Sequence, residues 1–500
     1  MAILALLGVI GAALAYTAQL SQGLTVTGLN NQSQWGIYLA NYVFWIGISK
    51  GGTLISALLR LTRSGWRRPV TRCAEAITVF AMVIGPAFAV LHMGRPMYFW
   101  RCFPLPDAQG LWPNFRSPLV WDVVALTTYL IGSLVYLWMP LIPDAATLRD
   151  RTTGVRKRLY TLIAVGWEGT ARQWALLEAA IRIMAVVVLC VAVSVHTVVS
   201  FVFGLSTVPG WHSTIFGPMF VMGAMYSGLA AVIVAMAVVR SALGLQERIT
   251  ARQFDPLAKI LLVLTLVWAW FIGSDMLTVW YGGTGIERAV LATKTAGAHG
   301  ATFWAMVLCN LAIPLALLPW HRVRRSPAAL AGICMVILAG MYLERMHIVI
   351  PALETPRLMA AAAPAYSPGF VELAVSGGTV AAFVLMYMLF VRYFPIVAIW
   401  EWQAGERSSK LPIMDSAGPP SGRTRLTRVA LAGGAIGFVL AIGVPWFATA
   451  AWPINVGGMD PSPVWTGAIV AFEGAMLGVI VATVLGLIRG APLLRARSDP

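Results

Sequence analysis

Ionisable side chains interrupt the long apolar runs of this sequence at a few places, and these residues are the ones that could do chemistry. They are His92, Arg95, Asp122, His196, Asp275, Glu344 and Arg345, with His212 in a loop nearby. Holding such a group in hydrocarbon costs on the order of 2.5–3.5 kcal/mol on insertion scales. Each of them therefore needs a partner, a water-filled cavity or a function.

Proton transfer is the chemistry that these residue types offer. A histidine, whose ordinary pKa is about 6.5, can take a proton from a hydroxyl group and pass it to a carboxylate. Arg345 can keep a carboxylate ionised or bind a carbonyl oxygen. Aromatic residues close to these positions suit a flat, lipid-soluble ring, and a quinol meets all of these requirements.

We therefore assign roles to the candidates as predictions. His92 and Asp122 are expected to be catalytic, as the acceptors of the quinol protons. Quinol binding is expected from His92, Arg95, Tyr98, Asp122, His196 and Arg345. Proton transfer is expected from Asp275, Glu344 and Glu473.

Each candidate also has a structural interpretation. Asp122 stands near a helix start, where a carboxylate can cap backbone N–H groups. Arg95 suits an interfacial anchor, His196 a packed histidine and Glu344 an ion pair between helices. Two facing histidines could ligate a b-type haem, and His92 with His196 is the one couple that the sequence offers for it.

Membrane-spanning helices must position these residues. Of the 500 residues 59% are hydrophobic and 11% are charged, whereas a soluble domain has about a quarter charged. Twelve apolar segments are long enough to span a bilayer, which predicts an all-α polytopic membrane protein. They fall at about 2–22, 36–60, 73–93, 119–142, 179–204, 214–240, 257–281, 300–320, 328–350, 369–398, 429–450 and 463–488.

The basic residues indicate the orientation. Of the 36 Lys and Arg residues, 27 lie in loops on the same side as both ends of the chain, which predicts that both termini are cytoplasmic. The formal charge of +16 then reflects arginines that anchor the chain at membrane lipids, and no nucleic-acid partner is expected. The candidate residues all fall in the outer half of the membrane. Between residues 149 and 178 we expect an interfacial helix.

Cysteine spacing argues against redox centres in this chain. The five cysteines form no CxxC, CxxCH or ferredoxin-like run, so no covalent haem, iron–sulfur cluster or metal is expected. HExxH, P-loop and GxSxG motifs are missing as well, which argues against hydrolysis and phosphoryl transfer.

Several long strings resemble the polysulfide-reductase (NrfD-type) membrane subunits. They include GLNNQSQWGIYLANYVFWIGISKGGTLISALLRL from residue 28, LHMGRPMYFW, LWPNFRSPLVWD, SVHTVVSF, VPGWHSTIFGPMFVMGA and YLERMHIVIP. Within this family the sequence is most similar to the larger quinol-binding subunit of alternative complex III. The resemblance runs from about residue 24 to residue 400.

The resemblance implies ten helices, arranged as two four-helix bundles with flanking helices, and a site for menaquinol or a related quinol near the periplasmic face of the bacterial inner membrane. His92, Asp122 and Arg345 fall where the family has its proposed quinol or proton-handling residues. The implied partners are an iron–sulfur, molybdopterin-like periplasmic subunit, a multihaem cytochrome c subunit and a second NrfD-like subunit, with a terminal oxidase beyond them.

Three positions depart from the family pattern. Val202 replaces an acid in SVHTVVSFVF, Lys50 stands where a histidine is common, and Asp275 stands where a glutamate is expected. Either the proton route runs differently here, through Asp275 for example, or proton traffic differs from that of the relatives.

The last two helices resemble a different subunit of the same complex. AWPINVGGMDPSPVWTGAIVAFEGAML, which carries Glu473, is similar to the small membrane anchor of alternative complex III. We therefore expect three segments: a quinol-binding domain over residues 1–400, a cytoplasmic linker over 401–428 and a two-helix anchor over 429–500. For Glu473 a hydrogen-bonded packing role is the alternative to proton transfer.

Three functions fit the sequence. The first is a quinol-oxidising subunit of an alternative-complex-III-type respiratory complex, which passes electrons to an iron–sulfur partner. The second is the membrane anchor of a molybdopterin oxidoreductase for a sulfur or arsenic compound. The third is a secondary transporter that uses the outer polar site as an ion gate.

Overall fold

The computed structural model describes residues 2–62, 64–107, 109–112, 115, 117–355, 365–401, 421–451 and 464–489. Throughout these ranges the regular secondary structure is helical, and twelve helices are long and apolar enough to cross a membrane. The prediction of an all-α polytopic membrane protein with twelve spans is confirmed. Most of the predicted linker, residues 402–420, lies outside the described residues.

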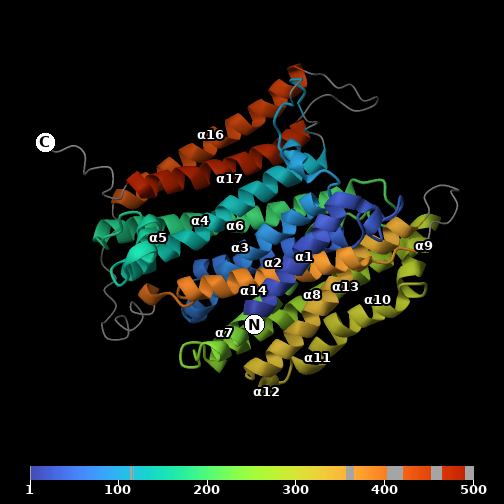
Figure 1. Ribbon diagram of the computed structural model, residues 1–500, viewed down its shortest axis with the longest axis horizontal. Helices are drawn as coiled ribbons and strands as arrows, with labels where there is room; N and C mark the ends of the chain where they lie inside the picture. Colours follow the sequence, from blue (N-terminus) through green and yellow to red (C-terminus); the bar gives the residue numbers. More distant parts are fainter. Residues whose placement is uncertain are drawn as a thin grey trace. The chain divides into compact units, whose positions relative to one another are not determined.

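The helices follow one another along the chain (Figure 1). They are α1 (Ala2–Gln22), α2 (Gly36–Leu61), α3 (Arg68–His92), α4 (Pro118–Arg149), α5 (Gly154–Ala164), α6 (Ala171–Gly204), α7 (Phe216–Ala242), α8 (Phe254–Gly282), α9 (Gly285–Thr295), α10 (Gly300–Val307), α11 (Ile313–Leu317), α12 (His321–Arg324), α13 (Pro327–Glu354), α14 (Phe370–Tyr393), α16 (Ser421–Ala451) and α17 (Val464–Arg489). Short turns of tighter or wider helix are η1 (Leu24–Val26), η2 (Gly65–Arg67), η3 (Pro96–Cys102), η4 (Ala251–Gln253) and η5 (Leu308–Ala312).

Three helices differ from the predicted spans. The α4 helix continues to Arg149 through Pro140 and Pro143, although prolines favour an earlier end. The carbonyl of Pro140 accepts hydrogen bonds from Arg72 and Trp400, so side chains support the backbone there. The α6 helix begins eight residues before residue 179, and α16 begins eight residues before residue 429.

The α9 helix was not predicted, because its residues are too polar and too few to span. Its start carries a capping box: the Thr284 hydroxyl accepts from the Glu287 N–H, while the Glu287 carboxylate accepts from the Thr284 N–H at 2.7 Å. This T-x-x-E pattern was a signal that the sequence offered.

A wide helical turn, η5, separates α10 from α11. Pro314 has no N–H group, so the carbonyl of Asn310 four residues earlier loses its partner within the helix. The Tyr226 hydroxyl on α7 donates to that carbonyl at 2.8 Å and itself accepts from Thr265 on α8 at 3.0 Å. The break in the helix is therefore stabilised by two neighbouring helices.

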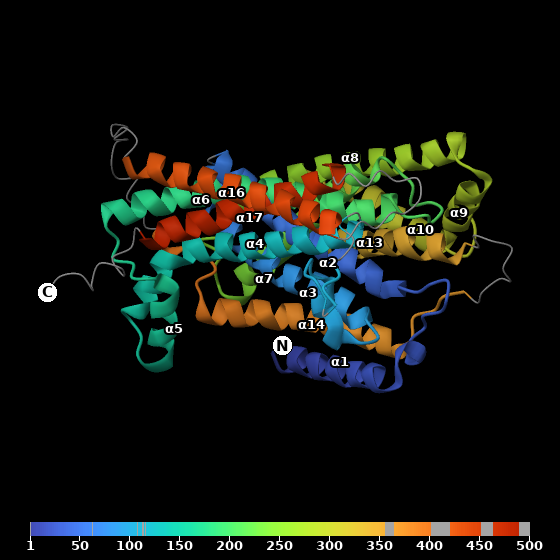
Figure 2. The same ribbon diagram turned by 90° about the horizontal axis from the view of Figure 1, so that it is seen from above.

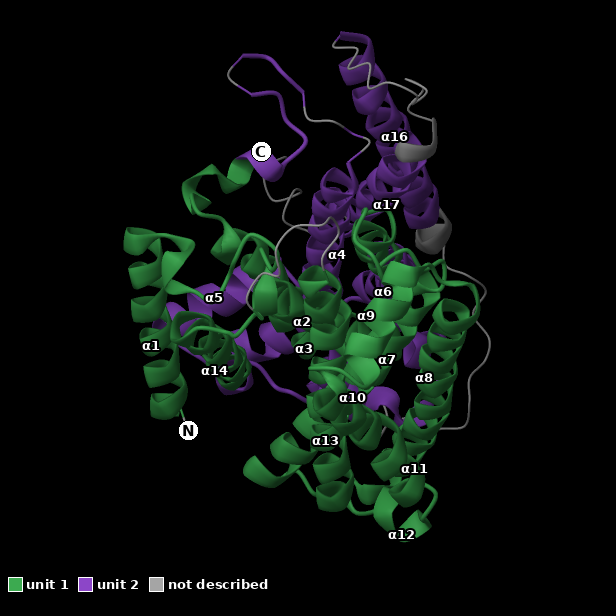
Figure 3. Ribbon diagram, turned by 90° about the vertical axis from the view of Figure 1, so that its right-hand side faces the viewer, with its two compact units in different colours: residues 1–55, 76–100, 196–390 green, residues 56–75, 101–195, 391–500 purple. Residues whose placement is uncertain are grey.

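The chain divides into two compact units that alternate along the sequence (Figure 3). Unit 1 comprises residues 1–55, 76–100 and 196–390, and unit 2 comprises residues 56–75, 101–195 and 391–500. The divisions fall inside α2, α3, α6 and α14, so these helices contribute to both units. The predicted division at residues 400 and 428 concerns sequence segments and stays a prediction.

Small residues allow close helix packing in both units. In unit 1, α1 lies beside α14 (Figure 2), where Gly8 faces Ala381. In unit 2, α16 and α17 form a hairpin (Figure 1) in which Gly437 lies against the backbone of Gly474. A Cβ atom on Gly437 would overlap the Gly474 carbonyl, so glycine is needed for this approach.

The hairpin predicts different outcomes for two glycines of the same helix. Gly437→Leu should lower the free energy of unfolding by about 1–3 kcal/mol, because the new side chain overlaps α17. Gly443→Leu is the matched control, since a Cβ atom there meets nothing within 4 Å. Thermal unfolding of both variants in detergent, compared with the unsubstituted chain, checks this. Equal unfolding temperatures for the two variants would contradict the close packing.

Candidate functional site

His92 lies against an aromatic corner at the end of α3. The helix ends there because Gly94 and Pro96 follow. The imidazole stacks on the Trp35 indole, with ring centroids 3.9 Å apart and an interplanar angle of 24°, and the edge of Tyr38 lies nearby. Among the described residues the buried Nδ1 atom of His92 has no hydrogen-bond partner.

The corner is held by a short chain of hydrogen bonds. The Tyr38 hydroxyl donates to the Gln19 side-chain carbonyl at 2.6 Å, and the Gln19 amide donates to the backbone oxygen of Leu91 at 2.8 Å. These bonds connect α1, α2 and the last turn of α3. They fix the surroundings of His92 without using either of its ring nitrogens.

The other quinol-binding candidates of this segment are exposed. Arg95 follows α3, and Tyr98 lies in η3 with 37% of its surface accessible. They are close to His92 along the chain, and their part in binding stays a prediction.

Asp122 is buried in unit 2, on the second turn of α4. Ser117 occupies the N-cap position of this helix and Asp122 is its fifth residue, so the capping alternative is wrong. His92 belongs to unit 1. That the two residues meet at one site stays a prediction.

A buried pair joins α2 and α6 within unit 1. The Lys50 ammonium lies 2.9 Å from Nδ1 of His196, and both side chains are fully buried. An ammonium can donate only to a neutral imidazole, so a charged Lys50 holds His196 in the tautomer with its proton on Nε2. His196 is buried and bonded, as the packed-histidine alternative expects. Its partner, however, is the ionisable Lys50, so the pair can also take part in proton exchange.

Phe220 on α7 lies between this pair and Arg345. The His196 ring centroid is 5.9 Å from the Phe220 centroid, and the Arg345 guanidinium lies 5.1 Å from it on another helix, α13. A cation over a ring face is stabilised by the quadrupole of the ring. Gly223 makes room for the guanidinium, because a Cβ atom there would lie 2.6 Å from Arg345 Nη2.

Glu344 supplies the counter-charge. Its carboxylate lies 3.4 Å from Arg345 Nη1 and accepts a hydrogen bond from the Trp268 indole N–H on α8 at 3.1 Å. Both charged side chains are 2% exposed. The alternative of an ion pair between helices is not what forms here: the ion pair of Glu344 is with its neighbour on the same helix, and its contact with another helix is the hydrogen bond from Trp268.

Glu344 also lines a cavity of about 60 Å³ among α7, α8, α9, α10 and α13. This outer cavity has an apolar wall interrupted by five ionisable residues: Asp275, Glu287, Lys294, Glu344 and His347. A cavity of this size and polarity has room for a few water molecules. The structure thus brings together two predicted residues, Asp275 and Glu344.

The charges around the outer cavity are mixed. The Ser213 hydroxyl donates to Asp275 at 2.7 Å. Burial lowers the pKa of the Lys294 ammonium, and the Asp275 carboxylate acts in the opposite direction. Within the described residues, no side chain is hydrogen-bonded to either ring nitrogen of the buried His347. These groups can exchange protons with water held between them.

Sequence reasoning missed Lys294 and His347. Lys294 was counted only as a basic residue of an outer loop. His347 follows Glu344 by three residues on α13, which places both side chains on one helix face, and this spacing was a signal that could have found it. Just beyond, His299 Nε2 lies 2.7 Å from the Glu354 carboxylate.

Glu473 is fully buried on α17 and accepts a hydrogen bond from the Ser194 hydroxyl on α6 at 2.7 Å. Both residues belong to unit 2. The hydrogen bond is what the packing alternative expects, and a proton-transfer role for Glu473 stays a prediction.

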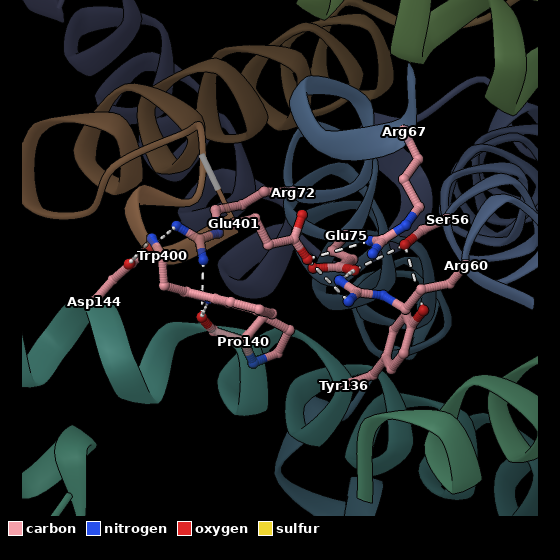
Figure 4. A network of polar contacts seen from close by, with 10 residues as sticks. All are labelled: Ser56, Arg60, Arg67, Arg72, Glu75, Tyr136, Pro140, Asp144, Trp400 and Glu401. Carbon is pink, nitrogen blue, oxygen red and sulfur yellow. Dashed lines mark hydrogen bonds and ion pairs between the residues drawn. The ribbon is translucent and has the colours of Figure 1, made fainter. Parts of the chain in front are cut away.

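A network of buried ion pairs in unit 2 was not predicted (Figure 4). Arg60 lies 3.2 Å from both Glu75 and Glu401, and Arg67 lies 3.2 Å from the same Glu401 oxygen. The Ser56 hydroxyl donates to Glu75 at 2.7 Å. These contacts tie the end of α2 and the start of α3 to the segment that follows α14.

A second part of the network is centred on Arg72 (Figure 4). It pairs with Asp144 on α4 and donates to the backbone oxygen of Pro140 at 2.8 Å, with both charged side chains at most 2% exposed. Asp144 also accepts from the N–H of Trp400 at 3.2 Å. The expectation that loop arginines anchor the chain at lipids is therefore wrong for Arg60 and Arg72, whose partners are carboxylates far along the sequence.

Within the described residues, no three His, Cys, Asp or Glu side chains lie close enough together to hold a metal ion.

Comparison with known proteins gives two family matches. Residues 25–357 match the model of polysulphide reductase, NrfD, and residues 417–498 match that of ActD, a component of alternative complex III. Residues 358–416 separate the two matches, which together cover most of the chain.

Individual relatives are similar over most of their length. A selenate reductase component of Mesobacillus selenatarsenatis is 23% identical over 79% of this chain and 93% of its own. The Hdr-like menaquinol oxidoreductase integral membrane subunit of Archaeoglobus fulgidus is 23% identical over 76% and 90%. Protein NrfD of Escherichia coli is 25% identical over 63% and 93%.

The position of Arg345 predicts that a methyl group added at Gly223 destabilises the protein. Gly223→Ala should lower the free energy of unfolding by about 1–3 kcal/mol, because the added Cβ displaces a buried guanidinium from its place over Phe220. Gly217→Ala on the same helix is the control, since its nearest neighbours lie at 3.8 and 3.9 Å. Chemical denaturation in detergent measures both. A loss no larger for Gly223→Ala than for the control would refute the constraint.

Proposed function

The chain belongs to the polysulphide reductase, NrfD family, and from this premise we propose that it binds and oxidises quinol as a membrane subunit of an alternative-complex-III-type respiratory complex. The second family match, to ActD of that complex, supports this assembly over others. A relative of 23% identity named as a menaquinol oxidoreductase membrane subunit supports menaquinol as the substrate.

The environment of His92 is the observation that carries the proposal. A quinol ring is flat and apolar with a hydroxyl group at each end, so its site needs an aromatic wall and a proton acceptor. His92 lies against Trp35 and Tyr38, and its buried Nδ1 has no partner among the described residues. An imidazole in that state accepts a proton from a hydroxyl group when the substrate enters.

In the proposed reaction, side chains of this protein accept the protons of the quinol and a partner subunit accepts its electrons. One quinol loses two protons and two electrons and becomes a quinone. His92 takes one proton and Asp122 the other, and Arg95 and Tyr98 border the entrance. Both electrons leave for an iron–sulfur cluster of a partner subunit, since this chain is expected to hold no redox centre of its own.

Protons leave through the outer cavity. Glu344 contacts Arg345 and also lines this cavity, so it connects the cavity with the region around Arg345 and His196. Asp275, Lys294 and His347 line the same cavity, which has space for water. Arg345 lies beside the Glu344 carboxylate and offers it a counter-charge whenever it is ionised. The route ends near the periplasmic face, and Glu473 provides a second carboxylate in unit 2.

The assembly follows from the same premise. The partners are an iron–sulfur, molybdopterin-like periplasmic subunit, a multihaem cytochrome c subunit and a second NrfD-like subunit, with a terminal oxidase beyond them. The location is the bacterial inner membrane, with both termini in the cytoplasm, in agreement with the side on which the basic residues gather.

One observation favours a second candidate, the membrane anchor of a molybdopterin oxidoreductase. A relative similar over 79% of this chain is named as part of a selenate reductase. The proteins that copurify with the chain separate the two functions. A multihaem cytochrome c supports the first, and an active molybdopterin enzyme supports the second.

Replacement of the proposed proton acceptors tests the function. His92→Ala and Asp122→Asn should each lower menaquinol oxidation by the purified complex at least about 100-fold, because a positioned general base contributes about 10²–10⁴ to the rate. His321→Ala is the control, since His321 is exposed on α12. Spectrophotometric turnover and the composition of the complex are measured together. Full turnover in either variant with an assembled complex would remove that residue from the mechanism.

A further inference from the structure

The α5 helix has a face that is unusual for a surface helix. Val155 and Leu162 are 81% and 77% exposed, and Leu159 lies between them on the same stripe. The opposite face is attached to the protein, where the Tyr160 hydroxyl donates to the backbone oxygen of Tyr393 at 2.7 Å. An exposed apolar stripe on a short helix rich in basic residues is typical of a helix that lies in the membrane interface.

A narrow groove begins where α5 ends. Its walls come from four helices of unit 2, namely Trp138 on α4, Ala164 on α5, Leu176 on α6, and Leu487 and Ile488 on α17. The groove therefore lies between the segment that matches NrfD and the segment that matches ActD.

The groove offers apolar surface rather than hydrogen bonds. Gln173 is its one polar lining residue besides the tryptophans, and its side-chain oxygen accepts from the N–H groups of Glu168, Gly169 and Thr170 at 2.9–3.3 Å. The Trp138 indole N–H donates to the backbone oxygen of Ile163 at 3.0 Å. With these groups occupied within the protein, the groove, whose volume is about 20 Å³, offers a hydrocarbon chain a shallow apolar contact and offers a polar ligand few partners.

Three arginines contact, or are next in sequence to, residues that line the groove. Arg149 donates to the backbone oxygen of Trp167, a lining residue, at 3.4 Å. Arg172 and Arg489 are exposed and stand next in sequence to the lining residues Gln173 and Ile488. Asp150 pairs with Arg149, and Glu168 and Glu178 are the other acids of this stretch. From residue 149 to 178 six basic residues outnumber three acidic ones, so the corner attracts an anion.

We propose that this groove binds one anionic phospholipid, with an acyl chain along Trp138 and Leu487 and the phosphate between Arg172 and Arg489. Phospholipid is the occupant that combines an apolar chain with a negative head group, and the exposed apolar stripe and basic residues of α5 are typical of a helix at the level of the head groups. The bound lipid joins α4 and α6 to α17 and so holds the C-terminal hairpin to the rest of unit 2. No quinol chemistry takes part, so the proposal is independent of the function argued above.

Native mass spectrometry of the full chain tests this, after purification and exposure to phosphatidylglycerol or phosphatidylcholine in separate samples. Arg172→Gln with Arg489→Gln should bind phosphatidylglycerol about 30-fold more weakly, because each surface arginine contributes roughly fivefold to the affinity for an anionic lipid. Ile488→Trp keeps every charge and fills the groove, and it should lose the lipid as well. Arg425→Gln with Arg428→Gln removes two exposed arginines from α16 and is the matched control.

Each outcome decides the proposal. Loss of phosphatidylglycerol in both groove variants but not in the control, with phosphatidylcholine bound weakly throughout, supports it. Equal binding of the two lipids by the unsubstituted chain overturns it, as does unchanged binding of phosphatidylglycerol in the groove variants. Circular dichroism and gel filtration establish that the variants are folded, and Ile488→Trp keeps the test valid if the double arginine variant fails to fold.

Discussion

Charged groups inside an apolar helical bundle are stable only when other charges or dipoles compensate them, and this constraint determines how the present chain packs. Leaving one partner of a buried ion pair without its counter-charge costs about 3–5 kcal/mol. Lys50 with His196, Arg345 with Glu344, and Arg72 with Asp144 all satisfy the constraint between or along neighbouring helices. Gly223 serves the same constraint, because the missing Cβ leaves room for the Arg345 guanidinium.

The two groups of buried ionisable residues differ in how well they suit stability and proton exchange. The network around Arg60, Glu75 and Glu401 joins positively and negatively charged groups directly, and it ties distant segments of unit 2 together. Around the outer cavity of unit 1 the groups are not joined into such a network, and no side chain is hydrogen-bonded to either ring nitrogen of His347 within the described residues. Direct ion pairs favour stability, whereas ionisable groups beside water favour proton exchange.

Local properties of the sequence predicted the twelve spans, because mean hydropathy over about twenty residues needs no knowledge of the fold. They also placed Asp275 and Glu344 in one region, and the structure brings both to one cavity. Pairings over long distances were out of reach. Arg72 finds Asp144 and Arg60 finds Glu401, and nothing in the composition near either arginine indicates such a partner.

The position of a residue along its helix explains the other contacts that differ from the predictions. Arg345 and Glu344 are adjacent in sequence, yet the first lies over Phe220 and the second accepts from Trp268, because successive helical residues point about 100° apart. Neither aromatic partner can be identified from the sequence around the pair. The exact helix start also could not be predicted for α4. Because Ser117 is its N-cap, Asp122 lies in the second turn and does not cap the helix.

The central claim is that a quinol binds against His92 and Trp35. Photolabelling of the purified complex with a light-reactive menaquinone analogue, followed by peptide mapping, tests it most directly. The account predicts label on the peptides that contain Trp35 and His92, and loss of that label when unmodified menaquinol is added in excess. Label that is confined to other helices, or that menaquinol does not displace, would contradict it.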